Sequence, residues 1–216
     1  MSNWKKVDAD QLYADLTSVA DAIRESPRFA EPLGFPNEYV SAIQQINAEY
    51  KALLDGTGTE VFVPEGITKI RDSAFYRMYD VTAIHIPEGV TAIGTQCFWD
   101  CGKLPEITFP PSTRTIDYAA FAWCGSLKMI DCWFTEINSE CVFWGCSGLD
   151  ALILRNTEMV ATLANANTFE SSKISHGTGY IYVPRSLVDS YKAATNWSTY
   201  ASQIRAIEDY PEITGG

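Results

Sequence analysis

From about residue 60, hydrophobic and polar positions repeat along the chain with a period of 23 residues. Short runs in which apolar residues alternate with other types end at Pro64, Pro87 and Pro110. Each run is followed, at a constant distance, by an isoleucine and then a phenylalanine. These pairs are Ile70 and Phe75, Ile93 and Phe98, and Ile116 and Phe121. Because several positions recur together, the pattern indicates a repeat architecture rather than a chance similarity.

The alternation within each run predicts a short, half-buried strand. Ile84 and Ile86 point to one side of such a strand and His85 points to the other. Proline ends the strand because it has no amide hydrogen to donate to the next rung. A single unit cannot bury its own apolar side chains, so successive units must stack on one another. We therefore predict an α/β repeat fold, a strand-rich solenoid of four to five units of about 23 residues.

The fourth unit departs from this pattern. Its apolar positions are Ile130, Cys132, Ile137 and Phe143. Residues 131–134 (Asp-Cys-Trp-Phe) stand where other units have the end of the strand, proline, glutamate and glycine. We expect a local bend or a widened turn at this place. A fifth unit begins at residues 152–154, where three aliphatic residues follow one another.

The chain after residue 179 has the pattern of a C-terminal cap. Residues 180–184 repeat the strand-and-proline signal, and a helix is predicted over residues 186–207. The apolar stripe of this helix consists of Leu187, Tyr191, Ala194, Trp197 and Ile204. Such a strand and helix would close the apolar end of the stack. The tail, residues 211–216, is expected to be loose.

Residues 8–54 carry a different pattern, which predicts two helices. Apolar residues at helical spacing form two stripes; they are Leu12, Leu16, Val19 and Ile23, then Val40, Ile43, Ile46 and Tyr50. An αα-hairpin of this size has a small hydrophobic core, so it must pack against the solenoid, against copies of itself or against another protein. The predicted domains are a helical hairpin over 1–56, the solenoid over 57–179, and a cap with tail over 180–216.

The charge balance argues against anionic partners. Sixteen Lys and Arg residues face 27 Asp and Glu residues, which gives a formal net charge of −11. Such a chain repels phosphate backbones and anionic lipid surfaces, so we expect no nucleic acid partner. No stretch reaches the roughly 18 apolar residues of a transmembrane helix, and we expect no membrane insertion. The first residues lack the apolar segment of a signal peptide, so export by the general secretory route is not expected.

The repeat itself resembles a known family. Residues 84–104 read I-x-I-P-E-G-V-T-x-I-G-x-x-C-F-x-x-C-x-x-L, which resembles the BspA-type leucine-rich repeat family. The resemblance covers about residues 60–155 and is specific, because many positions recur in several units. It implies a leucine-rich-repeat solenoid that acts in surface or cell contact in bacteria. That role is one of binding rather than catalysis.

A second, shorter resemblance concerns residues 8–46. The segment DLTSVADAIR at residues 15–24, followed by LGFP at 33–36 and Ala42-Ile43, is similar to N-terminal segments of tail proteins from phages of Gram-positive bacteria. This resemblance implies that the N-terminal region attaches the protein to a larger particle. It would also account for a repeat protein that has no signal peptide.

Three of the six cysteines occupy one column of the repeat. Cys101, Cys124 and Cys146 share this column, in which the first unit has Met78. Stacked positions about 4.8 Å apart fall within the Cα range of disulfides, so a disulfide ladder or a metal site is one interpretation. The other is that small, soft groups fill a tight corner of the solenoid, and Met78 favours it. Since no histidine accompanies the other three cysteines, Cys97, Cys132 and Cys141, we expect no metal site and no cofactor.

The sequence contains no recognisable catalytic arrangement. Of the two histidines, His85 lies on the outward side of a strand and His176 lies in a predicted loop. Neither stands at a recognisable spacing from a nucleophile. The two Gly-Thr-Gly segments lack the glycine spacing and the lysine of a phosphate-binding loop. We expect that the protein is not an enzyme.

Aromatic residues are the best candidates for a binding site. Tyr76, Trp99 and Trp144 directly follow the repeat phenylalanine, and the third unit has Ala122 and then Trp123 at this place. With Trp133 of the irregular unit, these side chains would form a flat edge for sugar rings or a protein partner. Alternatively they shield the core at a wide turn. A second candidate face is the outward strand column of Phe62, His85, Thr108, Asp131 and Ile153.

Two functions are compatible with these patterns. The first is a non-enzymatic recognition or adhesion protein that presents its repeat surface to a protein or glycan partner, on a phage tail or a bacterial surface. The alternative is a structural component whose hairpin, residues 8–54, assembles copies into a homo-oligomer or larger particle, with the repeats as a spacer. An aromatic row that is open to solvent would favour the first.

Overall fold

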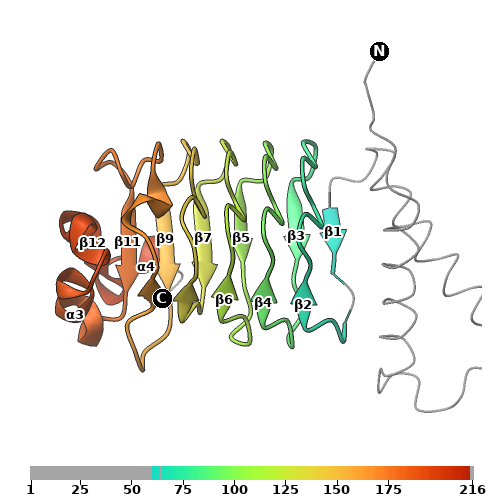
Figure 1. The fold of residues 1–216 in the computed structure, drawn as a ribbon. Helices are drawn as coiled ribbons and strands as arrows, with labels where there is room; N and C mark the ends of the chain where they lie inside the picture. The colour runs from blue at the N-terminus through green and yellow to red at the C-terminus, as the bar shows by residue number, and fades with distance from the viewer. Residues whose placement is uncertain (1–59, 64, 215–216) are drawn as a thin grey trace, which may run out of the picture.

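The computed structural model describes residues 60–63 and 65–214. The predicted hairpin of residues 8–54 and Pro64 lie outside this described part. Within it, successive coils of the chain lie side by side, and each strand runs parallel to the strands with which it pairs (Figure 1). This arrangement confirms the predicted solenoid.

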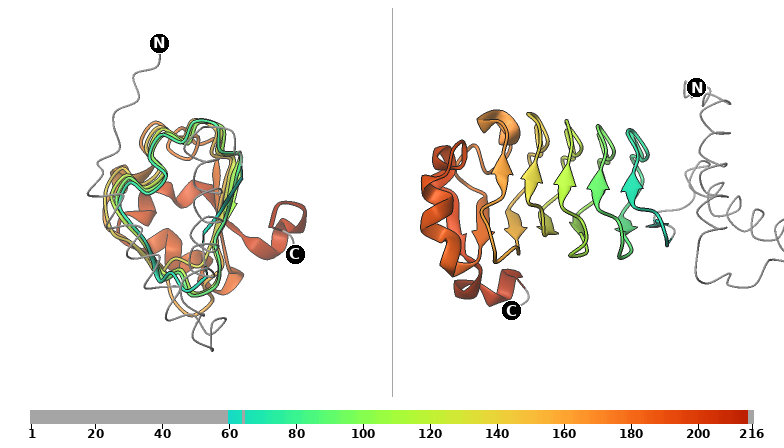
Figure 2. Two further views of the ribbon diagram at one scale, coloured as in Figure 1. Left: turned by 90° about the vertical axis from the view of Figure 1, so that its right-hand side faces the viewer. Right: turned by 60° about the horizontal axis from the view of Figure 1, so that its bottom comes forward.

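Two walls of the solenoid are formed by parallel strands. The first wall consists of β1 (Glu60–Phe62), β3 (Ala83–His85), β5 (Glu106–Thr108), β7 (Met129–Cys132), β9 (Ala151–Leu154), β11 (Tyr180–Val183) and β12 (Ile204–Ala206). The second wall consists of β2 (Lys69–Ile70), β4 (Ala92–Ile93), β6 (Thr115–Ile116), β8 (Glu136–Ile137) and β10 (Thr162–Leu163). Seen along the stack, the first coils superimpose almost as one outline (Figure 2).

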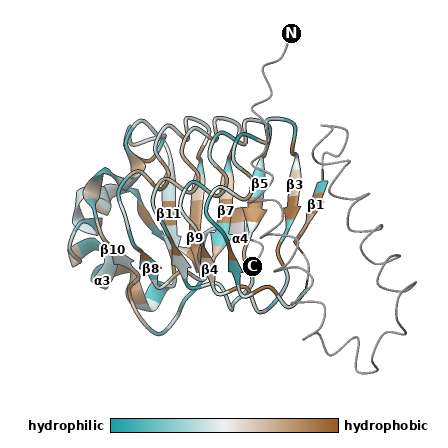
Figure 3. Ribbon diagram, turned by 45° about the vertical axis from the view of Figure 1, so that its right-hand side comes forward, coloured by the Kyte–Doolittle hydropathy of each residue, from teal (hydrophilic) through white to brown (hydrophobic). Residues whose placement is uncertain are grey.

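The strand register brings equivalent repeat positions together. Ile70 lies opposite Ile93, and Ile93 lies opposite Ile116. In the first wall, Ile107 pairs with Ile130 in the same way. All five side chains are buried, and hydrophobic stretches recur in the strands of successive coils (Figure 3). Each coil therefore covers the apolar side chains of its neighbour, as the sequence pattern predicts.

A third wall is built from stacked turns. One inward phenylalanine from each coil lies at its centre, and their rings stack from coil to coil. In order they are Phe75, Phe98, Phe121, Phe143 and Phe169, with ring centroids 5.3, 4.8, 6.1 and 5.2 Å apart. Backbone hydrogen bonds join the turns: the amide of Phe98 donates to the carbonyl of Ala120 and that of Asp100 to Ala122, both at 2.8 Å. These bonds hold the turns of neighbouring coils in one register.

In each of the first four turns, two residues have a left-handed backbone, one on each side of the inward phenylalanine. Around Phe98 they are Gln96 and Asp100, with φ of 53° and 57°. The corresponding pairs are Ser73 and Arg77, Ala119 and Trp123, and Cys141 and Gly145. This conformation costs a residue other than glycine roughly 1–2 kcal/mol. The hydrogen bonds between turns and the burial of phenylalanine offset that cost in these coils.

The irregular fourth coil is shorter rather than wider. Ile130 and Ile137 are seven residues apart, whereas Ile107 and Ile116, in the preceding coil, are nine apart. Strand β7 continues to Cys132, which pairs with Leu154, and the chain then crosses directly to the second wall. The expected local bend is found at Thr135, between β7 and β8, whereas the alternative of a widened turn is wrong. An extended segment covers more distance per residue than a turn does, so this coil closes with two fewer residues.

The C-terminal cap starts with strand β11, as predicted, but then differs from the single helix expected over residues 186–207. It contains the 3-10 helices η3 (Arg185–Leu187) and η4 (Trp197–Gln203) and the α-helix α3 (Val188–Ala193). A further strand follows, in which Ile204 pairs with Ile181 of β11. Ile204 thus lies in a strand and not on the predicted helical stripe. The added strand supplies hydrogen bonds for the edge that β11 would otherwise leave open.

Three aromatic side chains of the cap close the phenylalanine column. Trp197 and Tyr200 lie against the ring of Phe169, with centroids 6.1 and 5.1 Å apart. The indole of Trp197 donates to the carbonyl of Ala161 at 2.7 Å, and the hydroxyl of Tyr191 accepts from the amide of Ala161 at 2.9 Å. Burial raises the pKa of Tyr191 to about 12. Each large ring is therefore buried while its polar atom keeps a hydrogen bond.

The tail after β12 is ordered and folds back onto the first wall. It forms η5 (Ile207–Asp209) and α4 (Pro211–Thr214). In the view along the stack, this segment lies outside the coils, beside the first wall (Figure 2). Tyr210 contacts Tyr182 of β11 with ring centroids 5.4 Å apart. Residues 211–214, which were expected to be loose, form the short helix α4, and Pro211, Glu212 and Ile213 are exposed. The contacts with the sheet come from Ile207 and Tyr210, which precede them.

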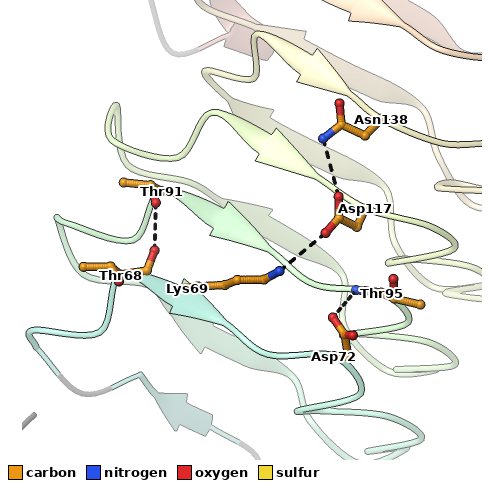
Figure 4. A network of polar contacts seen from close by, with 7 residues as sticks. All are labelled: Thr68, Lys69, Asp72, Thr91, Thr95, Asp117 and Asn138. Carbon is orange, nitrogen blue, oxygen red and sulfur yellow. Dashed lines mark hydrogen bonds and ion pairs between the residues drawn. The ribbon is translucent and has the colours of Figure 1, made fainter. Parts of the chain in front are cut away.

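Polar contacts join coils on the outer side of the second wall (Figure 4). The hydroxyl of Thr91 donates to the carbonyl of Thr68, and the amide of Thr95 donates to the carboxylate of Asp72, both at 2.9 Å. The carboxylate of Asp117 lies 3.7 Å from the ammonium of Lys69 and accepts a hydrogen bond from Asn138 at 3.4 Å. An exposed ion pair contributes at most about 1 kcal/mol. These contacts therefore help to fix the register, while burial supplies most of the stability.

Candidate recognition surfaces

Aromatic side chains from four coils lie along the turn wall, and we call Tyr76, Trp99, Trp123 and Trp144 the aromatic edge. Tyr76 and Trp99 stack with ring centroids 6.2 Å apart and an interplanar angle of 29°. Tyr76 is 39% exposed. The guanidinium of Arg77 lies 5.5 Å from the Tyr76 ring centroid and 3.7 Å from the carboxylate of Asp100. The first half of the edge is therefore a stacked aromatic pair beside a solvated ion pair.

Trp123 belongs to a different column from the other three aromatics. Ala122 takes the position equivalent to Tyr76 and Trp99 and is buried, while Trp123 has a left-handed backbone with φ of 65°. Its ring nevertheless reaches Trp144 of the next coil, with centroids 5.3 Å apart, and it is 48% exposed. A Cβ atom on Gly145 would lie 3.1 Å from the Trp123 ring. The absence of a side chain at residue 145 therefore makes room for the second aromatic pair.

The outward strand column has the predicted register over much of the first wall. Phe62 lies opposite His85, and their rings stack at 4.2 Å with an interplanar angle of 9°. Thr108 lies opposite Asp131, and Asp131 lies opposite Ile153. Phe62 is 66% exposed and His85 is exposed. The N-terminal part of this column is thus open to solvent and carries a stacked aromatic platform.

Asp131 is held by Arg155, a residue that the sequence analysis did not identify. The two side chains form a bidentate pair with N–O distances of 2.6 and 2.8 Å. Hydrogen bonding to Asp131 holds the pKa of the Arg155 guanidinium above its ordinary value. Arg155 directly follows β9, one coil after Asp131. Alignment of the fourth and fifth units in the sequence could therefore have predicted that the two residues lie close together. Trp133, half-buried, follows β7 and belongs to this wall rather than to the aromatic edge.

The far end of the outward column is not a free surface. Ile153 and Tyr182 are buried in a small apolar cluster with Ala151, and Ile207 and Tyr210 of the tail pack against this cluster. The inclusion of Ile153 in a candidate binding face is therefore wrong. The tail divides the outer side of the first wall into an open part at β1, β3 and β5 and a covered part at β9 and β11.

The cysteine column is a row of buried thiols. Cys101, Cys124 and Cys146 donate hydrogen bonds to the carbonyls of Phe75, Phe98 and Phe121, at 3.2, 3.0 and 3.0 Å. All six cysteines are free, so the alternative of a disulfide ladder does not hold. Burial raises the pKa of Cys101 and of Cys146 to about 12. The column therefore fills a corner of the core and ties each turn to the preceding coil.

Alkylation of the native protein with iodoacetamide is expected to label Cys141 first. Cys141 is only partly buried, whereas the other five cysteines are fully buried. The thiolate is the reactive form, and at about pH 8 a thiol with a pKa near 12 is ionised to only about one part in ten thousand. Mass spectrometry should find one label per native chain and six after unfolding in guanidinium. Rapid native labelling of Cys124 would contradict the placement of this column in the core.

The described residues contain no group of three or more His, Cys, Asp or Glu arranged to hold a metal ion. His85 Nε2 lies 3.7 Å from a carboxylate oxygen of Glu60, and His176 Nδ1 lies 2.8 Å from the carbonyl oxygen of Ser172. Among residues 60–63 and 65–214, no helix has the length and apolar character needed to cross a membrane.

Several solved structures of leucine-rich repeat proteins are similar to this chain. A leucine-rich cell surface protein from Faecalibacterium prausnitzii is 22% identical, with a TM-score of 0.46, over 67% of this chain and 35% of that one. A leucine-rich repeat protein from T. pallidum is 18% identical, with a TM-score of 0.36, over 53% and 68% of the two chains. One from Bacteroides ovatus is 21% identical, with a TM-score of 0.32, over 58% and 39%. The chain thus spans about a third of the first of these proteins.

No curated protein matches the sequence. The model of the BspA-type leucine-rich repeat region matches residues 56–183 in six copies, one or two more than the four to five units expected from the sequence pattern. The additional copies are consistent with the first wall, in which β1, β3, β5, β7, β9 and β11 each begin a coil. With more than half of its residues in these repeats, the chain belongs to the BspA-type leucine-rich repeat family.

Proposed function

We propose that the protein is a recognition or adhesion module that holds a glycan or protein partner on its aromatic edge. The observation that supports this proposal is the arrangement of the edge into two stacked pairs, Tyr76 with Trp99 and Trp123 with Trp144. The setting that we propose is a bacterial surface or a phage tail. Binding without catalysis also agrees with the role that the family resemblance implies.

The edge is suited to binding because its backbone is fixed before any partner arrives. The amide of Arg77 donates to the carbonyl of Trp99 at 2.7 Å, and the amide of Trp123 donates to that of Trp144 at 2.7 Å. Aromatic side chains have few rotatable bonds, so little conformational entropy is lost when such a surface is covered. Preorganisation of this kind favours affinity without requiring a deep pocket.

The two pairs also offer a surface of useful length. With coils about 4.8 Å apart, four coils extend about 15 Å along the stack. That length is sufficient for a short oligosaccharide, whose ring faces can lie on aromatic rings, or for an aromatic-rich protein loop. The exposed rings of Tyr76 and Trp123 lie in the first and third of these coils. A partner that contacts both would therefore bridge the two pairs.

Substitution of either edge tryptophan is expected to weaken binding. A glycan array and a panel of bacterial surface proteins would be screened with the full chain, and hits compared with Trp99→Ala and Trp144→Ala. Each variant should lose about tenfold in affinity, because an interface aromatic typically contributes about 1–2 kcal/mol. Met159→Ala, which shortens a large exposed side chain that belongs to neither candidate surface, serves as the control. Equal affinity of the wild type and both tryptophan variants would rule out the aromatic edge.

A further inference from the structure

A shallow depression lies on the outer side of the first wall, between β3 and β5. Its volume is about 440 Å³. The side facing β3 is formed by residues 82–86, and the side facing β5 by residues 105–108 together with Pro110. His85 and Thr108 of the outward column are among these residues. We refer to it as the β3–β5 depression.

The depression exists because the strand ladder of the first wall is interrupted at this point. β3 pairs with β1 in a sheet of two strands, while β5 begins a separate sheet of five strands that continues through β7 to β12. The facing edges of β3 and β5 are therefore not joined by ladder hydrogen bonds. In the second wall, β2 and β4 remain paired with β6, so the coils stay stacked behind the opening. A ligand in the depression would therefore meet two strand edges that no ladder hydrogen bonds join.

The side chains around the depression favour a positively charged ligand. Glu106 lies on its rim, is exposed, and has no hydrogen bond or ion pair through its side chain among the described residues. Glu60 is also exposed and lies 3.7 Å from His85. Phe62, also on β1, stacks on His85 of β3 and presents its ring to solvent. Carboxylates next to an exposed aromatic face form a suitable environment for a lysine ammonium or an arginine guanidinium.

The boundaries of the open surface restrict what can occupy it. On one side Asp131 is neutralised by Arg155, and beyond it the tail covers the sheet. The tail of a second copy is a poor occupant for the open part, because Glu208, Asp209 and Glu212 would meet Glu60 and Glu106. Like charges at such short range are unfavourable. A cationic partner has the complementary charge.

We propose that the β3–β5 depression, with Glu106 at its rim and with Glu60 and Phe62 beside it on β1, binds an extended segment of a partner protein that carries a lysine or arginine side chain. The cation lies between the carboxylates and the Phe62 ring, and the segment's main chain lies over the interrupted ladder. This surface is on a different wall from the aromatic edge. Its occupant is independent of whatever the edge binds, so either proposal can fail alone.

The test is selection from an mRNA-displayed library of random short peptides against the immobilised full chain. Enriched sequences are expected to carry Lys or Arg, and their affinity for the wild type is measured by fluorescence anisotropy. The double variant Glu60→Gln/Glu106→Gln should bind the best peptide about tenfold more weakly, because two charge contacts are removed. Phe62→Ser should also weaken it. Raising the ionic strength should weaken binding to the wild type more than to the double variant.

Two control variants distinguish binding at this surface from nonspecific attraction to negative charge and from binding at the aromatic edge. Glu136→Gln/Glu158→Gln makes the same change in net charge at exposed positions elsewhere and should leave the affinity unchanged, as should Trp123→Ala. Selection of peptides without cationic residues, or no selection at all, would overturn the proposal. So would an equal loss in the Glu136→Gln/Glu158→Gln control, since that result would point to charge alone.

Discussion

Replacing Phe121 with alanine is expected to lower the free energy of unfolding by about 3–5 kcal/mol, the range for a fully buried phenylalanine. The ring is fully buried and stacks between Phe98 and Phe143, with centroids 4.8 and 6.1 Å away. It also meets the edge of Phe109 at 6.0 Å. Because coils before and after Phe121 both depend on it, the cavity would weaken two interfaces at once.

Urea unfolding followed by circular dichroism measures this loss. The control is Tyr79→Ala, which removes an aromatic ring from the turn of the first coil, where the side chain is 49% exposed. That variant should lose at most about 1 kcal/mol, as surface substitutions commonly do. A loss below about 1 kcal/mol for Phe121→Ala would be inconsistent with a phenylalanine column at the centre of the core.

The second large effect is expected for Gly94→Ala, with a loss of about 3 kcal/mol, at the upper end of the range for overpacking. A Cβ atom at residue 94 would lie 2.6 Å from the amide nitrogen of Asp72 and 2.7 Å from the carbonyl carbon of Arg71, and would also meet the carboxylate of Asp72. Backbone atoms cannot rotate away as a flexible side chain can. The first coil must therefore move, and the hydrogen bond from the Thr95 amide to Asp72 is strained with it (Figure 4).

Gly102→Ala provides the control for this substitution. A Cβ atom there has no heavy atom within 4 Å, so the variant should match the wild type or gain slightly from reduced freedom of the unfolded chain. Hydrogen exchange adds a local readout, since Gly94→Ala should lower protection most at the amides that join the first two coils, such as Gly94 to Ile70. Equal stability of the two alanine variants would mean that the coils are not in close contact at residue 94.

The fixed spacing of coils also explains why the two candidate surfaces exist at all. In the first two coils the residue after the inward phenylalanine lies at the same place on the turn wall, so Tyr76 of one coil meets Trp99 of the next. The outward strand positions are aligned by the same register, which stacks Phe62 on His85. A repeat of the core therefore produces repeated rows on the surface. The chemistry of each row is determined by the repeat positions whose side chains are not buried in the core.

Several features of the surfaces could not be predicted from the columns alone. The sequence places Trp123 one position after Ala122 and so does not show whether its ring can join the edge; it reaches Trp144 from the neighbouring column because Gly145 leaves space for its ring. Ile153 was expected to face solvent because of its alternation in the strand. It is covered by Tyr210 and Ile207, which lie far from it in the sequence. Local patterns contain no information about such contacts.

By itself the sequence determined the architecture of the repeats: the strand positions, the isoleucine pairs such as Ile70 with Ile93, the phenylalanine column and the inward cysteines. These features are predictable because every unit has an apolar face of the same kind, which only the next unit can cover. Only the tertiary structure decided the shorter fourth coil, the strand at Ile204, the docked tail and the interruption between β3 and β5. Those features depend on contacts between segments that are distant in the sequence. Such contacts form only when the whole stack is assembled, so no local pattern specifies them.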